Sequence, residues 1–407
     1  QSREIGDGRM MHNTRPTLLK GTLLVVGTSI GGGVLALPVL TASAGFLPSV
    51  VLYIACWLLM AGTGLLFLEV SQWMRGEANI LSMANYTLGL PGKWLAWVVY
   101  LFLFYCLTIA YMVGCGGIVG QLLPKDWPEW AGIGIFVVCF TPFIWMTTCL
   151  AARLNLLLVV GLVGSYFAFV WQGWDRVEGA RLFVADWGQW SAVLPIAFTS
   201  FAYQGIVPTL ARYFDHKEKT LRLSILWGTC IPLVMYIIWE ALILGIIPLE
   251  GKEGLLAAGE RGENAAYALR FFLSGSWLYW FGQAFAFFAL ITSFLGVSLG
   301  LRDFLSDGLQ IENRGFGKKS VLGILTLLFP LLFALFHPHA FLTALEYAGG
   351  IGCALLLGLL PIAMCWSGRY AKGLLFNQQL PGGRWMLSGL ALFVFIELSY
   401  ECARLFY

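Results

Sequence analysis

Long apolar stretches separated by short polar breaks run along almost the whole 407-residue chain. A bilayer hydrocarbon core about 30 Å thick is crossed by roughly 20 apolar residues of α-helix. The pattern therefore predicts an all-α membrane protein with eleven transmembrane helices, at residues 17–42, 46–73, 94–123, 130–150, 153–173, 190–212, 221–249, 268–301, 320–337, 340–366 and 385–403. This count requires Pro338, His339 and Ala340 to form a turn between the ninth and tenth spans.

The composition agrees with a chain whose surface faces lipid. Hydrophobic residues make up 59% of the chain and charged residues 12%, whereas soluble domains carry about 25% charged residues. The net charge of +3 is spread over short loops, so we expect membrane lipid and no nucleic acid as a partner.

Lysine and arginine residues are distributed unequally between the two sides of the predicted bundle. With eleven spans, 18 of the 25 fall on the side of the N-terminus and seven on the other side. Because cytoplasmic loops carry the excess of Lys and Arg, we expect a multi-pass protein with its N-terminus in the cytoplasm. The expected location is a bacterial inner (plasma) membrane. Residues 1–16 would form a cytoplasmic N-terminal tail.

Two of the predicted spans contain helix-breaking sequences. The first contains three consecutive glycines, Gly31–Gly33, each of which costs about 1 kcal/mol relative to Ala inside a helix. The sixth contains Thr199–Gly205 between Pro195 and Pro208, and proline disturbs the helical hydrogen-bond ladder. Both spans are therefore predicted to be broken.

The two broken helices occupy matching places in the chain. Each is the first of five spans, in residues 17–173 and 190–366, and the span at 385–403 is left over. Because five is odd, the second set would cross the membrane in the opposite sense. Broken helices in corresponding positions of inverted repeats mark the binding site of transporters, so we expect a single transporter domain over residues 1–407.

The breaks also suggest which ligand would bind. Freed N–H groups around Ile30–Gly33 suit a carboxylate, and freed carbonyls near Gly27–Ser29 and Phe198–Phe201 suit an ammonium group or a cation. One site with both polarities fits an α-amino acid. The alternative is that the glycines only let helices pack closely. The substrate-site candidates at the breaks are Thr28, Ser29, Ile30, Gly31, Gly32, Gly33, Ser200, Phe201, Ala202, Tyr203 and Gln204.

Several motifs in the same order resemble those of one known family. The main one is Gly27–Pro38, G-T-S-I-G-G-G-V-L-A-L-P. Weaker matches follow at Leu66–Val70, Phe198–Phe201, Val207–Pro208, Thr292–Val297, Pro338–Phe341 and Leu345–Gly349. Over nearly its whole length the chain resembles the hydroxy/aromatic amino acid permeases of the amino acid–polyamine–cation superfamily. It is closer to their tyrosine/tryptophan branch than to their serine/threonine branch.

The resemblance implies a LeuT-type 5+5 inverted-repeat fold with broken helices 1 and 6 and one extra C-terminal helix. It also implies alternating-access uptake of tyrosine, tryptophan or phenylalanine, usually with protons. Two positions depart from the family pattern, since Ala202 replaces a glycine and Gln204 replaces a histidine. Glutamine does not titrate, but it can hydrogen-bond a phenol or an indole N–H. A serine/threonine-type permease is the alternative within the family.

Aromatic side chains on spans 3, 6 and 8 are candidates to line a pocket for the substrate ring. Core packing or contact with lipid is the alternative role for each of them. Beyond Phe201 and Tyr203 at the break, the candidates are Tyr105, Tyr111 and Phe288.

The sequence leaves the coupling ion open between H⁺ and Na⁺, and we expect no other cofactor. In sodium-coupled relatives of this fold, two hydroxyls on the eighth span complete a Na⁺ site, and Thr292 and Ser293 would supply them. Alternatively, the two hydroxyls bond to their own helix. Ionisable residues inside a membrane are functional candidates, so Glu240 and Glu346 are candidates for proton coupling, or else are hydrogen-bonded structural carboxyls.

Three other interpretations fit less well. A solute channel would need a continuous pore, and an amino acid sensor would need a sizeable signalling region. The sequence contains no H-E-x-x-H or G-x-S-x-G motif, so we do not expect an enzyme. A monomer is the expected state.

Overall fold

The computed structural model describes residues 17–74, 79–124, 126–145, 148–214, 217–273, 275–311, 316–374 and 378–406. The predicted N-terminal tail, residues 1–16, lies outside the described residues. The α-helices are α1 Leu18–Ser29, α2 Gly33–Leu40, α3 Phe46–Trp73, α4 Ile80–Gly120, α5 Trp130–Phe140, α6 Thr148–Gly173, α7 Leu194–Ser200, α8 Val207–Tyr213, α9 Glu218–Ile246, α10 Leu255–Glu260, α11 Ala265–Ala268, α12 Arg270–Leu273, α13 Trp277–Leu309, α14 Phe316–Phe336, α15 Phe341–Tyr347, α16 Leu360–Trp366 and α17 Gly383–Phe406.

Short 3₁₀ and π-helical segments complete the described secondary structure. The 3₁₀ segments are η1 Thr141–Trp145, η2 Trp174–Arg176, η3 Gly179–Phe183, η4 Trp187–Val193 and η5 Gln204–Ile206. The π-helical segments are η6 Ala348–Leu359 and η7 Ser367–Ala371.

Nine helical segments in the described part of the chain are long and apolar enough to cross a membrane. The bent pair α1 and α2 adds a tenth when it is counted as one span. The predicted fourth span, 130–150, is too long: α5 ends at Phe140 and α6 begins at Thr148. Pro142 lies between them and has no N–H to continue an α-helix. The count of eleven membrane-length helices is therefore not reached.

Other boundaries also differ from the prediction. The third span was expected from residue 94, but α4 already begins at Ile80, where Asn79 caps it. Gly89 interrupts α4 with a φ of 76°, a backbone conformation that favours glycine. The eighth span begins at Trp277 and not at 268, because α12 is a separate turn. Residues 338–340 do form the turn that the separation of spans 9 and 10 required.

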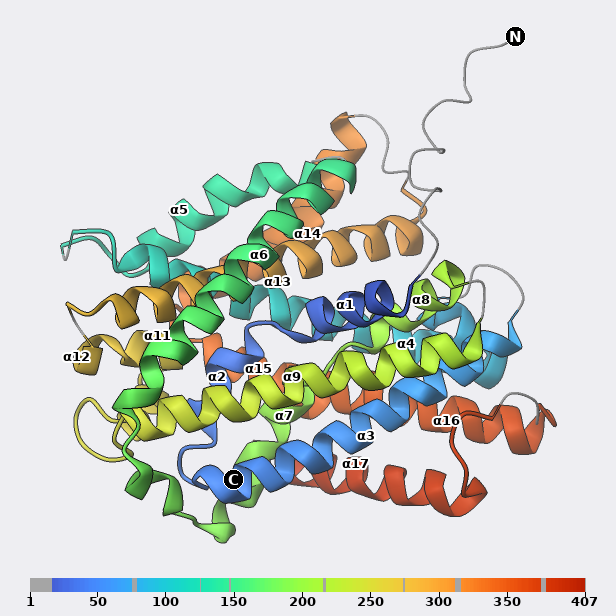
Figure 1. The fold of residues 1–407 in the computed structure, drawn as a ribbon. Helices are drawn as coiled ribbons and strands as arrows, with labels where there is room; N and C mark the ends of the chain where they lie inside the picture. Colours follow the sequence, from blue (N-terminus) through green and yellow to red (C-terminus); the bar gives the residue numbers. More distant parts are fainter. Residues whose placement is uncertain are drawn as a thin grey trace.

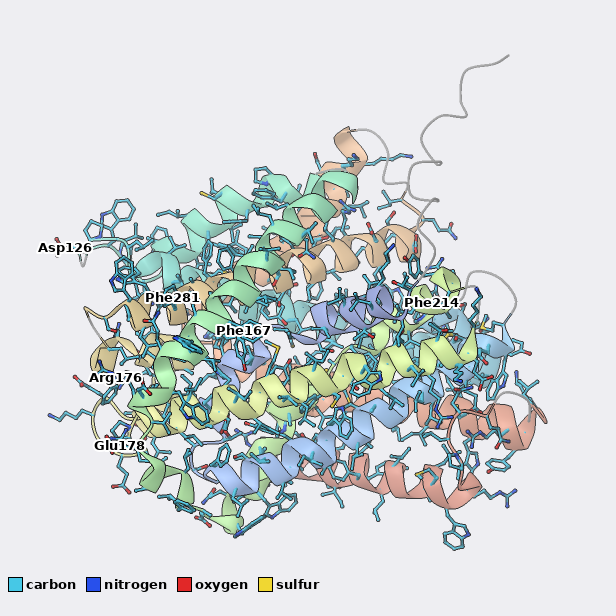
Figure 2. All side chains as sticks on the ribbon, in the orientation of Figure 1. Asp126, Phe167, Arg176, Glu178, Phe214 and Phe281 are labelled. Atoms are coloured by element: carbon cyan, nitrogen blue, oxygen red, sulfur yellow. The ribbon has the colours of Figure 1, made fainter. Side chains whose placement is uncertain are left out.

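The long helices lie roughly side by side, with the short helices of the two breaks among them (Figure 1). α1 packs against α9, α2 packs against α7, and α13 packs against α6 and α4. Aromatic side chains on the outside, such as Phe167 on α6, point away from the bundle (Figure 2), and this one is well exposed. A surface of this kind suits lipid and not water.

The bundle has two chemically different ends. We call the end at which α1 begins the basic end, because many of the described lysines and arginines lie there. Lysines and arginines occur near the starts of α1, α9 and α14 and near the end of α8, which lie toward this end in Figure 1. Fewer occur in α10–α12 and at the end of α17, toward the opposite end.

A fully buried ion pair joins three segments at the basic end. Arg369 of η7 donates from Nε and Nη2 to the two carboxylate oxygens of Glu69 on α3, at 2.7 and 2.6 Å. The side chains are 1% and 0% exposed. The backbone N–H of Gln379 also donates to Glu69, at 2.9 Å, and its side chain donates to Glu218 at the start of α9. The pair therefore holds α3, η7 and the segment before α17 together.

We predict that Glu69→Gln destabilises the protein by about 3–5 kcal/mol, because it leaves the Arg369 charge buried without its partner. Thermal unfolding of the detergent-purified protein, followed by circular dichroism, measures the loss. The double variant Glu69→Gln, Arg369→Met removes both charges and should be more stable than the single one. A single variant as stable as the wild type contradicts the prediction.

Candidate functional site at the two helix breaks

The first break separates α1 from α2 by a 53° bend. Ile30 is extended, with φ −79° and ψ 110°, and it ends α1. Within the described residues, the N–H groups of Gly31, Gly32 and Gly33 donate to no backbone carbonyl. These N–H groups lie at the start of α2, the positive end of its dipole. The predicted break is confirmed, and its free N–H groups can bind an anion.

The three glycines let three other helices approach the break. A Cβ atom on Gly31 would lie 2.9 Å from Ser293 Oγ of α13, and one on Gly33 would lie 2.6 Å from Ser200 Oγ of α7. A Cβ on Gly32 would lie 2.6 Å from the ring of Tyr111 on α4. Contacts this short exclude any side chain, so the glycine run both frees the N–H groups and brings these three walls together.

The second break lies between α7 and α8. α7 ends at Ser200, and α8 begins at Val207 after the short η5 turn. Pro195 and Pro208 stand in the first turns of α7 and α8, where a missing N–H costs no helical hydrogen bond. The prolines therefore start the two half-helices, and the predicted break at 199–205 is confirmed.

One tyrosine, Tyr236 on α9, reaches both breaks. Its hydroxyl lies 2.7 Å from the carbonyl oxygen of Ser29 at the end of α1. It lies 3.0 Å from the carbonyl oxygen of Ser200 at the end of α7. The single phenolic proton is shared between these two carbonyls, which have lost their helical donors. The sequence analysis missed Tyr236, because nothing along the chain distinguishes it from other aromatic residues of that span.

Glu240 lies one helical turn beyond Tyr236 and is fully buried. It accepts hydrogen bonds from Thr41 Oγ1, at 2.5 Å, and from the hydroxyl of Tyr53 on α3, at 2.9 Å. Thr41 is the residue that ends α2. Tyr236 and Glu240 therefore attach α9 to the ends of both halves of the first broken helix.

Gln204 and Tyr203 face α3 in this structure. The Gln204 amide donates to the carbonyl of Met60, at 3.1 Å, and to Thr63 Oγ1, at 3.2 Å. Its oxygen accepts the N–H of Tyr203, at 2.9 Å. The Tyr203 hydroxyl lies where a Cβ on Gly64 would stand. These contacts fix the backbone of the second break. The Gln204 amide, which was predicted to hydrogen-bond the substrate, bonds to other residues of the protein instead.

The hydroxyls proposed as sodium ligands bond to their own helix. Thr292 donates to Phe288 O at 2.8 Å, and Ser293 donates to Ala289 O at 2.7 Å. Ser293 nevertheless lies directly beside Gly31. Thr28 likewise bonds to Val25 O, at 2.9 Å.

Three further predicted residues lie away from the breaks. The hydroxyl of Tyr105 donates to Leu325 O on α14, at 2.9 Å, and lines a separate cavity of about 630 Å³. The ring of Phe288 packs over Gly161 of α6. Glu346 on α15 forms an ion pair with Arg404 of α17, at 3.1 Å.

A cavity of about 760 Å³ lies at the opposite end of the bundle. Its floor includes Gly114 of α4, and Leu290 and Phe341 lie directly against that glycine. Leu290 also contacts the Gly32 position, next to Tyr111. These side chains therefore separate the cavity from the first break.

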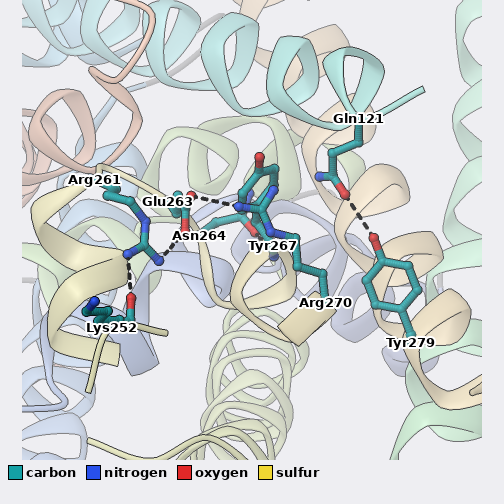
Figure 3. Close-up of polar contacts among 8 residues, drawn as sticks. All are labelled: Gln121, Lys252, Arg261, Glu263, Asn264, Tyr267, Arg270 and Tyr279. Atoms are coloured by element: carbon teal, nitrogen blue, oxygen red, sulfur yellow. Dashed lines mark hydrogen bonds and ion pairs between the residues drawn. The ribbon is translucent and has the colours of Figure 1, made fainter. Parts of the chain in front are cut away.

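Polar residues of α10–α12 and their loop border this cavity (Figure 3). Glu263 accepts from Arg261 at 2.9 Å and from Arg270 at 3.4 Å, and the Arg270 guanidinium stacks 3.7 Å from the Tyr267 ring centre. The hydrogen bond to Glu263 raises the pKa of Arg261. Across the cavity, Tyr279 donates to Gln121 at 2.9 Å. These contacts hold the segment from α10 to α12 in place. The segment covers α2, because α10 and α11 both pack against that helix.

The two halves of the first broken helix are enclosed to different degrees. Every residue of α2 from Gly33 to Val39 is buried, whereas Gly27 and Thr28 near the end of α1 are exposed. The break itself is enclosed, since Ser29, Ile30 and Gly32 are buried, and the exposed face lies on α1.

Paired helix breaks with free backbone groups, inside a bundle of membrane-length apolar helices, are the features of a membrane transport protein. Comparison with known proteins is consistent with this class. Residues 14–400 match the model of the tryptophan/tyrosine permease family. The chain belongs to this family and is an integral membrane protein.

Several curated bacterial proteins are similar along most of their length. The tyrosine-specific transport system 1 of Haemophilus influenzae is 33% identical over 86% of this chain and 88% of its own. The tyrosine-specific transport system 2 of the same organism is 31% identical over 90% and 91%. Its tryptophan-specific transport protein is 29% identical over 96% of both chains.

We predict that Gly32→Ala destabilises the protein by about 1–3 kcal/mol, because its Cβ would overlap the Tyr111 ring. The matched control is Gly164→Ala on α6, where nothing lies within 4 Å of the added Cβ. Melting temperatures of the two purified variants give the comparison. Equal melting temperatures would mean that Tyr111 moves freely away from the break.

Proposed function

We propose that the chain imports an aromatic amino acid by proton-coupled secondary transport with alternating access. Tyrosine is the favoured substrate, with tryptophan and phenylalanine as further ones. The observation that carries the proposal is the pair of facing helix breaks, whose freed carbonyls meet at Tyr236 and whose freed N–H groups belong to Gly31–Gly33. Similarity to transport proteins named for tyrosine and tryptophan supports the substrate class.

Each part of an α-amino acid has a complementary group at the breaks. The N–H groups of Gly31–Gly33 would hold the carboxylate. Carbonyl oxygens at the ends of α1 and α7 would accept from the ammonium group. Tyr111 and Phe201 are the predicted aromatic residues nearest these groups, and edge or offset contact with a substrate ring contributes about 0.5–1.5 kcal/mol beyond the buried area.

The packing of the helices supports an inverted repeat of the LeuT type. In such a repeat, each of spans 1 to 5 corresponds to the span five places later in the chain. A contact between spans 1 and 7 must therefore have a counterpart between spans 6 and 2. α1 packs against α9, and α7 and α8 both pack against α3. Likewise, a contact between spans 5 and 8 must have a counterpart between spans 10 and 3. α6 packs against α13, and α15 and η6 both pack against α4.

The difference in exposure between α1 and α2 supports alternating access. A carrier must open its site toward one side while the other side is covered, and here α2 is buried on one side of the break while α1 has an exposed face on the other. We place α1 and the basic end in the cytoplasm of a bacterium, since Lys and Arg gather on the cytoplasmic side. The same distribution puts the cover of α10–α12 on the outer face.

The coupling ion is proposed to be the proton, because the membrane-spanning part holds buried glutamates. Glu240 and Glu346 are the residues predicted for this role. Sodium coupling is the alternative, and Ser293 beside Gly31 favours it, since its hydroxyl would face a cation between α1 and α13. A serine or threonine substrate is the second alternative.

Uptake of labelled tyrosine into proteoliposomes tests the proposal, with an imposed pH gradient and an imposed Na⁺ gradient in separate runs. We expect the pH gradient alone to drive accumulation, and tryptophan and phenylalanine to compete. Accumulation that requires Na⁺ would establish the alternative coupling. Competition by serine without any aromatic uptake would contradict the substrate assignment.

We predict that Tyr236→Phe lowers tyrosine uptake, because the carbonyls of Ser29 and Ser200 lose their donor and the breaks lose their alignment. An unsatisfied buried polar group costs about 1–3 kcal/mol. The matched control is Tyr166→Phe, since that hydroxyl also donates to a helix carbonyl of α9, that of Met235, which is partly buried and belongs to neither break. Initial rates at equal amounts of reconstituted protein give the comparison. Equal rates for both variants would contradict a special role for Tyr236.

A further inference from the structure

Glu397 on α17 is a fully buried carboxyl group without a partner. Its exposed fraction is 0%. Neither carboxylate oxygen has a hydrogen-bond partner among the described residues. An ionised carboxylate left unpaired in an apolar interior is prohibitively costly, so such a group takes up a proton. Protonation makes the carboxyl neutral and so removes this cost.

A row of charged groups leads from the surface to Glu397. Arg404, in the last turn of α17, is 44% exposed, and Glu401, one turn before it, is 3% exposed. Glu397 lies one further turn inside, on the same face of the helix. Arg404 contacts Glu401 at 3.5 Å and Glu346 of α15 at 3.1 Å. A proton that arrives from the opposite end of the bundle therefore meets Glu401 before Glu397.

Two adjacent glycines connect this row to the second helix break. A Cβ on Gly349 would lie 1.8 Å from the carbonyl oxygen of Pro195 and 2.3 Å from Thr199 Oγ1, both on α7. A Cβ on Gly350 would lie 2.4 Å from Cγ of Glu401 on α17. Thr199 also donates to Leu345 O, at 2.8 Å. The start of η6 is therefore held between α7 and α17, and the two glycines contribute no side chain of their own to these contacts.

The local helix geometry at this contact is unusual. The chain changes from α-helix to π-helix at Ala348 and stays π-helical to Leu359. π-helical segments are rare and occur frequently at functional sites. The backbone of η6 touches the Glu401 side chain on one side and the Pro195 carbonyl of α7 on the other, so a movement of Glu401 would be passed through η6 to α7.

The titratable groups around Glu397 are few. On α17 these are Glu401 and Arg404, from α15 Glu346 faces Arg404, and from α3 Cys56 approaches Glu397. The segments packed on α17 also carry two cysteines. Cys365 of α16 donates to Leu66 O on α3, and Cys353 of η6 is fully buried. Arg404 is the one cation of this set.

We propose that Glu397 carries the coupled proton of this transporter, at a site on α17 separate from the substrate site at the breaks. It takes the place of the two predicted glutamates, because Glu240 is bonded to two hydroxyls and Glu346 is paired with Arg404. The inference rests on the proposed function, since it names where the proton binds. A proton passes along Glu401 and forms an O–H bond with the Glu397 carboxylate, which becomes neutral and can remain buried. On release the O–H bond breaks, the proton passes to water on the cytoplasmic side, and the new anion is drawn toward Arg404. The resulting shift of α17 moves η6 through Gly350 and α7 through Gly349.

Glu397→Gln tests the site, because glutamine has the shape of the protonated acid and cannot release a proton. Full-length protein in proteoliposomes would be assayed for tyrosine accumulation under a pH gradient, and for tyrosine counterflow without a gradient. For one proton per substrate, a gradient of about one pH unit supports about tenfold accumulation. We expect Glu397→Gln to retain counterflow and to lose accumulation. The matched control is Glu253→Gln, an exposed glutamate of the loop before α10, which should accumulate like the wild type.

Every outcome of this experiment is decisive. Wild-type accumulation by Glu397→Gln overturns the site while leaving the proposed function intact. A wild type that responds only to Na⁺ overturns proton coupling and this site together. If Glu397→Gln loses counterflow as well, Glu397→Asp decides: retained accumulation with a shifted pH dependence supports a titratable group, and an unshifted pH profile overturns it.

Discussion

The arrangement of the site depends on one shared hydrogen-bond donor, the hydroxyl of Tyr236. Breaking a helix in an apolar interior leaves carbonyl oxygens without their usual partners, and no water is available to replace them. Tyr236 satisfies one such oxygen from each broken helix, Ser29 and Ser200. A net hydrogen bond contributes only about 0.5–1.5 kcal/mol, but its loss would leave two groups unpaired. A single continuous helix, α9, therefore holds both breaks in position.

The three glycines of the first break determine how closely the neighbouring helices approach it. Gly31, Gly32 and Gly33 leave no room for side chains because Ser293, Tyr111 and Ser200 occupy that space. The free N–H groups therefore point into a position bounded by three helices. An amino acid bound there would contact backbone atoms, which have fixed polarity and cannot titrate, so its recognition would be nearly independent of pH. This separates binding of the amino acid from any step that depends on protons.

Three fully buried glutamates illustrate how differently such a chain can treat the same side chain. Glu69 is paired with Arg369, so its charge is compensated and it holds the basic end together. Glu240 accepts from two hydroxyls, which orient it while leaving it without a counter-ion. Glu397 has no hydrogen-bond partner among the residues that the structure describes. Burial alone does not distinguish the three glutamates, but their partners do. Glu69 forms a structural ion pair, Glu240 connects helices, and Glu397 is the proposed proton site.

Much of the architecture could be predicted from the sequence, because lipid imposes a simple rule on helix length. The glycine run and Pro195 with Pro208 located both breaks, since these residues act on the local backbone regardless of what surrounds them. The same locality explains the errors. Pro142 ended α5 early, and the separate turn α12 lay before the eighth span, because hydropathy averaged over a span does not sense single backbone interruptions.

Side-chain partners were beyond the reach of the sequence. Gln204 was expected to face the substrate and instead bonds to Met60 of α3, and Tyr105 lies against α14. Tyr236 was overlooked although it contacts both breaks. Each of these contacts joins residues from helices far apart in the chain, and any face of an apolar helix can be buried. The sequence by itself determined where the backbone must break, through residues whose effect is local. Only the tertiary structure decided which side chains meet those breaks, since that depends on how the helices rotate against one another.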